Sequence, residues 1–353
     1  MADSRTYHEQ TTIDYTLRLR EILKTLPGFA KDFFRAIEPT SSIRTRMNYA
    51  YDIRVFFHFL MENNPVFSNY TIHQFTLNDL ECLEPVDIEE YMEYLKVYKR
   101  DDDELMTNGE KGLARKMSSL RSFYGYYYKR QTISKNPTLL VDMPKMHDKA
   151  IIRLDADEVA MLLDHVESCG NKLTGQAKNY YEKTKERDLA ILTLLLGTGI
   201  RVSECVGLDL NDVDFKNNGI KVTRKGGNEM VVYFGDEVAD ALLTYINGDR
   251  KAVNPLQGHE NALFLSTQKR RMGVQAIENM VKKYARQVTP NKKITPHKLR
   301  STYGTSLYKE TGDIYLVADV LGHKDVNTTK KHYAAIDENR RRQAATAVKL
   351  REY

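Results

Sequence analysis

The sequence predicts a mainly α protein with two domains. Its 353 residues exceed the size of one ordinary domain, about 100 to 200 residues. Apolar residues recur at steps of three and four along most of the chain, which places them on one face of a helix. Only the segment 219–234 has the composition of a strong β-hairpin. We expect a helical first domain and a mostly α second domain with a small antiparallel sheet.

Composition excludes several classes of protein. The chain is 41% hydrophobic and 29% charged with only 19 glycines and 9 prolines, so it is neither disordered nor fibrous. It has no apolar run near the 18 to 20 residues, roughly, of a membrane-spanning helix. Its first five residues lack the basic and apolar layout of a signal peptide. We therefore expect a cytoplasmic protein without a membrane partner.

Cysteine spacing and net charge limit the partners further. Cys82, Cys169 and Cys205 are widely spaced and form no C-x-x-C pair, which argues against a disulfide framework or a zinc site. The net charge of +5, with an isoelectric point near 8.8, permits a nucleic acid as partner without requiring one. The positions of the cations are better evidence for or against a nucleic-acid partner than their number.

Three amphipathic helices are predicted in the first domain. They begin near Ser42, at Asp87 and near Lys111. The third has a basic outer face, which suits contact with a phosphate backbone, although a solvated charged face is the commoner explanation. The expected core positions of the first and third helices are Tyr49, Ile53, Phe56, Phe57, Leu60, Leu113, Met117, Leu120, Tyr124 and Tyr127.

Two prolines mark the end of this domain. Pro137 and Pro144 interrupt the helical pattern, because proline cannot donate to a helix and restricts the residue before it. We place the first domain at 1–140, a linker at 141–155 and the second domain at 156–353.

The second domain begins with a helix from Asp155 to His165. A polar segment at 168–186 reads as a loop or a short helical insertion. A buried helix at 188–196 then ends in a glycine turn. After the hairpin the pattern is helical again from Asp236.

Four segments of the second domain carry residues suited to anions. They contain Arg201, the hairpin lysine Lys225, the sequence Thr295-Pro296-His297-Lys298-Leu299-Arg300, and Leu321-Gly322-His323 followed by Tyr333. Each residue alone has a plain structural reading. Arg201 could pair with Glu204 on one helix face, and Lys225 could be an ordinary turn residue. Together, however, they supply two arginines, a lysine, two histidines and a tyrosine without clustered carboxylates.

In order and spacing these segments resemble the tyrosine recombinase (phage integrase) superfamily. That pattern runs T-G-x-R-x-x-E, a hairpin lysine before glycine, H-x-x-R, L-G-H and a tyrosine near the C-terminus. Segments 185–191, 222–227 and 295–300 are further similar to the single-component Xer recombinases of the XerS type, which resolve chromosome dimers. The resemblance covers nearly the whole chain.

The sequence departs from this pattern at two places. Ser301 stands where many relatives have a second histidine. Tyr333 follows His323 by ten residues, where nine are common in Xer proteins.

The resemblance implies a fold and a set of catalytic residues. The first domain would be a SAM-like core-binding domain that clamps DNA, and the second would carry the tyrosine recombinase fold. The implied catalytic residues are Arg201, Lys225, His297, Arg300, His323 and the nucleophile Tyr333.

These residues suggest a mechanism without metal or nucleotide cofactor. Tyr333 would attack a DNA phosphate and form a 3′-phosphotyrosyl bond. Arg201 and Arg300 would stabilise the phosphate, because guanidinium groups bind its oxygens in pairs. Lys225 would protonate the departing 5′ oxygen, and the two histidines would assist.

The expected partner is double-stranded DNA at a specific recombination site. Candidate DNA contacts in the first domain are Arg44, Arg46, Arg115 and Lys116. The resemblance implies a homotetramer on two duplexes that exchanges strands through a Holliday junction. The tail 337–353 would form a helix that docks on the next subunit or folds back on its own domain. An accessory protein, such as a DNA translocase or a directionality factor, is possible.

Three alternatives remain open at this stage. The protein could be an integrase or excisionase of a phage or transposon. It could be a DNA-binding protein that keeps this fold without catalysis, or a type IB topoisomerase, which shares the chemistry without the site specificity.

Overall fold

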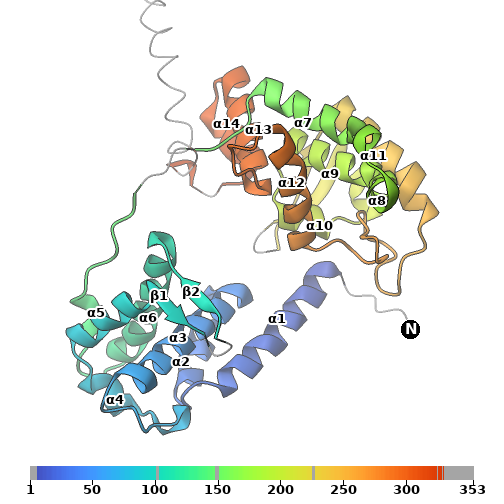
Figure 1. Cartoon of the computed structure of the whole chain (residues 1–353). Coiled ribbons are helices and arrows are strands. Elements are labelled where there is room, and N and C mark those ends of the chain that lie inside the picture. Colours follow the sequence, from blue (N-terminus) through green and yellow to red (C-terminus); the bar gives the residue numbers. More distant parts are fainter. Residues whose placement is uncertain are drawn as a thin grey trace, which may run out of the picture. The chain divides into compact units, whose positions relative to one another are not determined.

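The computed structural model of the chain is shown in Figure 1. It describes residues 6–100, 103–147, 151–224, 227–323, 325–327 and 329. The described residues form two compact units, one ending at residue 147 and one beginning at residue 151. The division lies inside the range 141–155, where we expect the linker.

The first unit contains the three helices expected from the sequence and three more. Its six α-helices are α1 (Tyr7–Lys24), α2 (Ala30–Ala36), α3 (Ile43–Asn63), α4 (Leu77–Cys82), α5 (Pro85–Tyr94) and α6 (Glu110–Lys129). The start of α3 has a clear local cause, because the Ser42 hydroxyl accepts a hydrogen bond of 3.1 Å from the Thr45 amide.

The first unit also contains a short β-hairpin, in addition to the one that the sequence predicts at 219–234. Strands β1 (Val97–Lys99) and β2 (Leu105–Thr107) pair antiparallel. Each has three residues, too few to produce a recognisable alternation in sequence. Tyr98 and Met106 pair across the hairpin, and both pack on the core.

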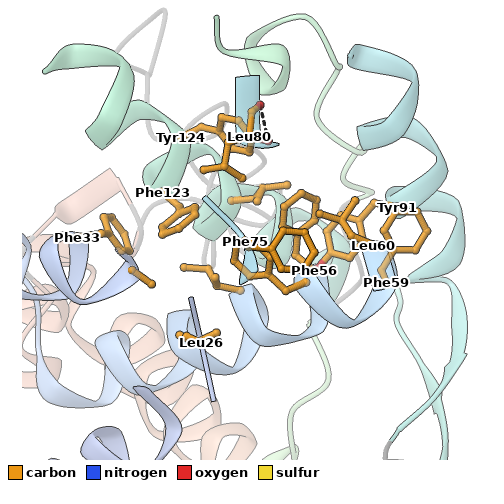
Figure 2. Packing of buried hydrophobic residues seen from close by; sticks show 14 of the residues in the cluster. Leu26, Phe33, Phe56, Phe59, Leu60, Phe75, Leu80, Tyr91, Phe123 and Tyr124 are labelled. Atoms are coloured by element: carbon orange, nitrogen blue, oxygen red, sulfur yellow. Dashed lines mark hydrogen bonds between the residues drawn. The ribbon is translucent and has the colours of Figure 1, made fainter. Parts of the chain in front are cut away.

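Aromatic side chains dominate the core of this unit. Phe56 contacts Tyr91 with ring centroids 5.1 Å apart, and Phe57 contacts Phe75 at 5.0 Å. The Tyr124 hydroxyl donates a bond of 3.3 Å to the Leu80 carbonyl, so this buried polar group is satisfied (Figure 2). All ten core positions expected for α3 and α6 pack into this cluster.

One buried carboxylate joins α3 to α6. Asp52 is 2% exposed and accepts hydrogen bonds from Lys116 Nζ and Ser119 Oγ, both at 3.2 Å, and a third from Arg115 Nη1. Lys116 is itself only 6% exposed. A buried charge is tolerated only where it is paired and hydrogen-bonded, and this cluster meets that condition.

The described part of the second unit contains eight α-helices and a three-stranded sheet. The helices are α7 (Ala156–Ser168), α8 (Gly175–Glu182), α9 (Lys185–Thr198), α10 (Val202–Gly207), α11 (Asp236–Tyr245), α12 (Val274–Val288), α13 (Pro296–Thr311) and α14 (Ile314–Leu321). Helix α8 lies in the polar segment, so the helical alternative for 168–186 is confirmed. Helix α9 is buried along most of its length and contacts α7, α11 and α13.

The sheet has the order β3 (Val213–Asp214), β4 (Gly219–Thr223) and β5 (Glu229–Tyr233), with both pairs antiparallel. The predicted hairpin is therefore confirmed. Its last paired residues are Thr223 and Glu229, so the segment between them forms the turn.

The three cysteines are free thiols, with Cys205 buried and Cys82 exposed. A search of the described helices finds none with the length and apolar character needed to cross a membrane.

We predict that Asp52→Ala lowers the free energy of unfolding by about 3–5 kcal/mol, because it leaves Lys116 as an unpaired buried charge. Urea unfolding of the full chain, followed by circular dichroism, measures this change. Glu21→Ala is the matched control. Glu21 pairs with Lys24 at 2.8 Å, but both side chains are about two thirds exposed. Its loss should cost less than about 1 kcal/mol. Equal effects in the two variants would contradict the role given to Asp52.

Candidate active site

A glycine turn after α9 brings the first candidate arginine into place. The helix ends at Thr198, and Gly199 has φ of +63° while its amide donates to the Leu195 carbonyl at 3.1 Å. A side chain at Gly199 would be strained in this left-handed region, and its Cβ would also overlap the Tyr303 ring. The turn makes Arg201 the residue that precedes α10.

Glu204 orients Arg201. The Glu204 carboxylate accepts one bond of 2.7 Å from Arg201 Nη1 and another of 2.8 Å from the Arg201 amide. The Glu204 side chain is 3% exposed, whereas that of Arg201 is 35% exposed. The buried acid thus fixes the guanidinium, and part of the cation still faces solvent. The pairing that the sequence offered as a structural reading of Arg201 is present.

The second arginine of the pattern is almost completely buried. Arg300 lies on α13 and is 5% exposed. Its Nη1 donates to the Gly199 carbonyl and its Nη2 donates to the Leu321 carbonyl. Arg300 therefore ties the turn after α9 to the end of α14. His297 lies one turn earlier on α13 and is exposed.

Helix α14 ends in a glycine turn at Gly322. Gly322 has φ of +61°, its amide donates to Asp319 at 2.8 Å, and the His323 amide donates to Ala318 at 2.9 Å. This is the Schellman arrangement, which reverses the chain after a helix. The His323 ring is held beside the turn, with Nδ1 2.7 Å from Thr329 Oγ1.

Three guanidinium groups meet at these carbonyls. Arg300 reaches Leu321, and Arg201 Nη2 donates to the Gly322 carbonyl at 3.3 Å. Arg224, which precedes the hairpin lysine, donates from Nη2 to Val320 at 2.7 Å and from Nη1 to Asp319 at 3.5 Å. The carbonyl end of a helix carries partial negative charge, so it attracts all three cations.

The arrangement gathers positive charge at the end of α14. Burial and the neighbouring Arg201 charge lower the pKa of the Arg224 guanidinium, while Glu204 and Asp319 act in the opposite direction. The guanidinium groups of three arginines converge at one helix end, and among the described residues one buried carboxylate, that of Glu204, lies beside them. Such a site favours an anion, above all one with several oxygens.

The structure brings three of the six expected catalytic residues together at the end of α14: Arg201, Arg300 and His323. His297 shares a helix with Arg300. Lys225 and Tyr333 lie outside the described residues. Two residues of the cluster were missed as site residues, Glu204 and Arg224. Glu204 had a signal, its spacing of three from Arg201, whereas the only signal for Arg224 was its place next to Lys225.

The four expected DNA contacts of the first unit differ in their surroundings. Arg44 is exposed and lies over the Tyr15 ring at 5.7 Å. Arg46 pairs with Glu38 at 3.0 Å and its side chain is 14% exposed. Arg115 and Lys116 both bind Asp52. The burial of Lys116 disfavours the expected phosphate contact, whereas Arg44 and the half-exposed Arg115 stay candidates.

Within the described ranges, no three or more His, Cys, Asp and Glu side chains are grouped so that they could hold a metal ion.

Comparison with known proteins gives consistent matches along the chain. A model of the phage integrase family matches residues 153–340. The chain is 32% identical over 338 residues to the tyrosine recombinase XerC of Caldanaerobacter subterraneus subsp. tengcongensis, which covers 93% of this chain and 88% of the relative. It is 30% identical over 353 residues to the tyrosine recombinase XerS of Streptococcus uberis, with coverage of 92% and 96%.

Solved structures show the same fold. A post-cleavage complex of the XerH site-specific recombinase with a palindromic difH substrate has a TM-score of 0.66 at 16% identity, covering 98% of this chain and 91% of that one. The Tn1549 transposon integrase in complex with transposon right end DNA has a TM-score of 0.64 at 20% identity, covering 90% and 98%. The mainly α fold with small antiparallel sheets is confirmed.

We predict that Glu204→Gln lowers the free energy of unfolding by about 1.5–3 kcal/mol, because the charge-assisted bond to Arg201 is lost in a buried place. Urea unfolding of the full chain measures the change. Ser203→Ala is the control, since Ser203 is the exposed neighbour on the same helix. A Glu204→Gln variant as stable as Ser203→Ala would contradict the role of Glu204 as the group that holds Arg201.

Proposed function

The chain belongs to the phage integrase family and is a site-specific tyrosine recombinase of the Xer type, and on this premise we propose that it cuts and rejoins DNA through a 3′-phosphotyrosyl intermediate. The observation that carries the proposal is the convergence of Arg201, Arg300 and His323 at the end of α14. They come from three separate sequence segments. A phosphodiester is the multi-oxygen anion that such a set suits best.

The first step of the proposed reaction is attack by Tyr333. Its phenolic oxygen forms a bond to the scissile phosphorus, and the bond from phosphorus to the 5′ oxygen breaks. Tyrosine has an ordinary pKa of about 10, so the neighbouring cations must favour its ionised form. Because the new phosphotyrosyl bond is itself a phosphodiester, a second 5′ hydroxyl can displace Tyr333 without ATP.

The two arginines act on the phosphate. Arg201 keeps 35% of its side chain exposed beside the buried Glu204, so it can donate to a non-bridging oxygen. Arg300 binds two carbonyls in this structure, and we assign to it the fixing of the turn and the second contribution of positive charge. Negative charge increases as phosphorus becomes five-coordinate, which is where preorganised cations have most effect.

Proton transfer falls to the lysine and histidines. We assign to the Lys225 ammonium the proton that the departing 5′ oxygen takes up, since an alkoxide is a poor leaving group. His323 is oriented by Thr329 and can donate to the phosphate or move a proton. His297, exposed on α13, has the same proposed role.

Double-stranded DNA is the proposed partner of both units. Arg44 and Arg115 would add phosphate contacts in the first unit, which would make binding salt-dependent. We further propose a homotetramer on two duplexes, strand exchange through a Holliday junction, and an accessory protein that controls the reaction. The tail 337–353, for which we propose docking on the neighbouring subunit, lies outside the described residues.

We propose chromosome-dimer resolution in the cytoplasm as the biological role. The relatives named XerC and XerS, which match over more than nine tenths of this chain, support it. An integrase or excisionase of a mobile element would use the same chemistry on another site.

We predict that Tyr333→Phe abolishes covalent protein–DNA adducts, because the phenylalanine ring has no oxygen that could attack phosphorus. The protein is incubated with fragments of the source organism's chromosome, and adducts are precipitated with potassium and dodecyl sulfate and sequenced. The control is Tyr315→Phe, which changes a tyrosine that is 72% exposed on α14. It should form as many adducts as the unaltered protein.

The same assay separates the alternatives. Adducts at one chromosomal site support dimer resolution, and adducts confined to the ends of a mobile element support an integrase. Relaxation of plasmids that lack the mapped site would favour a type IB topoisomerase. Adducts that persist after Tyr333→Phe would exclude Tyr333 as the nucleophile, and unaltered protein that binds DNA without adducts would exclude catalysis.

A further inference from the structure

Arg224 occupies an unusual place between the hairpin and α14. It is the last described residue before Lys225, and its guanidinium donates to two carbonyls of α14, Val320 at 2.7 Å and Asp319 at 3.5 Å. Arg224 is separated from Asp319 by 95 residues, so this contact joins two distant parts of the chain. Together with Arg201 at Gly322 it places the hairpin base next to the anion site.

The backbone at Arg224 closes the hairpin turn. The Arg224 amide donates to the Asn228 carbonyl at 2.8 Å, and the Gly227 amide donates to the Arg224 carbonyl at 3.0 Å. Gly227 has φ of +84°, a conformation that glycine adopts without strain. Arg224 thus belongs to the fixed base of a tight turn, and Lys225 is the next residue along the chain.

Gly322 makes room for the Arg224 side chain. A Cβ atom at Gly322 would overlap Arg224 Nη1. The Arg224 Nε atom is buried without a hydrogen-bond partner. A buried donor without a partner costs free energy, and so does a second cation beside Arg201. The two carbonyl bonds hold the guanidinium there despite both costs.

We propose that Arg224 is a positioning residue that anchors the Lys225 turn to the end of α14 and so sets the lysine ammonium beside the departing 5′ oxygen. This inference rests on the proposed function, in which Lys225 is the general acid. Without an anchor the lysine would be delivered by a free hairpin tip, and the entropy of ordering that tip would enter the barrier of each cleavage. With the anchor, the base of the turn at Arg224 is held before DNA arrives.

Two other roles for Arg224 make different predictions. A purely structural arginine would affect folding but not proton transfer. An arginine that binds the scissile phosphate would be needed whatever the leaving group is. A substrate whose leaving group needs no proton distinguishes these two roles from the positioning role that we propose.

Such a substrate has sulfur in place of the bridging 5′ oxygen at the cleaved phosphate. A thiol has a pKa of about 8.5, so a thiolate leaves unprotonated near neutral pH. A hydroxyl has a far higher pKa than a thiol, so an oxygen leaving group requires a general acid. The rates of adduct formation on the oxygen and sulfur substrates, both containing the mapped site, are measured in single-turnover reactions.

We predict that Arg224→Ala slows adduct formation on the oxygen substrate by about 10- to 100-fold, a part of the roughly 10²- to 10⁴-fold contribution of a general acid. On the sulfur substrate its rate should return to within about threefold of the unaltered protein. Lys225→Ala should show the same pattern with a larger defect. Arg224→Lys keeps the charge but lacks the planar fork of two donor nitrogens, so its defect should be intermediate.

Arg271→Ala is the matched control. Arg271 also donates to two helix-end carbonyls, Val206 at 2.9 Å and Leu208 at 2.7 Å, and it does so at the end of α10. Arg271→Ala removes the same kind of carbonyl contact at another helix end, together with an ion pair to Asp209. Any defect it causes should be equal on the two substrates.

The outcomes distinguish the failure of this inference from that of the proposed function. If sulfur restores Lys225→Ala but not Arg224→Ala, Arg224 does not act through the lysine and the inference is overturned. If sulfur restores neither, Lys225 is not the general acid, and that part of the proposed function fails with it. If Arg224→Ala and Arg271→Ala behave alike on both substrates, Arg224 is structural only.

Discussion

The site depends on one electrostatic fact, the partial negative charge of the main-chain carbonyls at the end of α14. A helix leaves its last carbonyl groups without intrahelical partners, and here three guanidinium groups complete them. Arg201 comes from the turn after α9, Arg224 from the hairpin and Arg300 from α13. Because all three bind the same helix end, the position of each is defined by the others, and the anion site is assembled before any ligand arrives.

In the first unit, a side-chain carboxylate rather than main-chain carbonyls gathers the cations. Asp52 sits in an aromatic core and is surrounded by Arg115, Lys116 and Ser119. This cluster holds α3 against α6, and the two helices carry all four candidate DNA contacts. Arg115 and Lys116 bind Asp52 and so have a structural role, and Arg46 pairs with Glu38. Arg44 is exposed and lies over the Tyr15 ring.

The sequence allowed α7, α9 and the hairpin of the second unit to be predicted, because their apolar patterns are clear. Beyond Asp236 it indicated only that the chain is helical, without separating α11 to α14. Arg201 and Arg300 were predicted because they belong to a spaced pattern of polar residues. The groups that these arginines bind could not be predicted, because they are main-chain carbonyls, which every residue type carries. The role of Arg224 was missed for the same reason. The hairpin formed by β1 and β2 was missed because strands of three residues are too short to show an alternation of apolar and polar residues. Lys116 looked like a surface cation because its partner, Asp52, lies 64 residues away.

The use of main-chain acceptors at α14 also determines which substitutions the end of this helix can tolerate. Asp319 and Val320 supply carbonyls to Arg224, yet their side chains take no part in those bonds, and Asp319 is exposed. Many residues at these two positions would therefore leave the contact intact. Gly322 has no such freedom, because its φ is positive and the Arg224 guanidinium fills the space of a Cβ. A library of variants at positions 319, 320 and 322 would be tolerant at the first two and intolerant at the last, although all three meet Arg224.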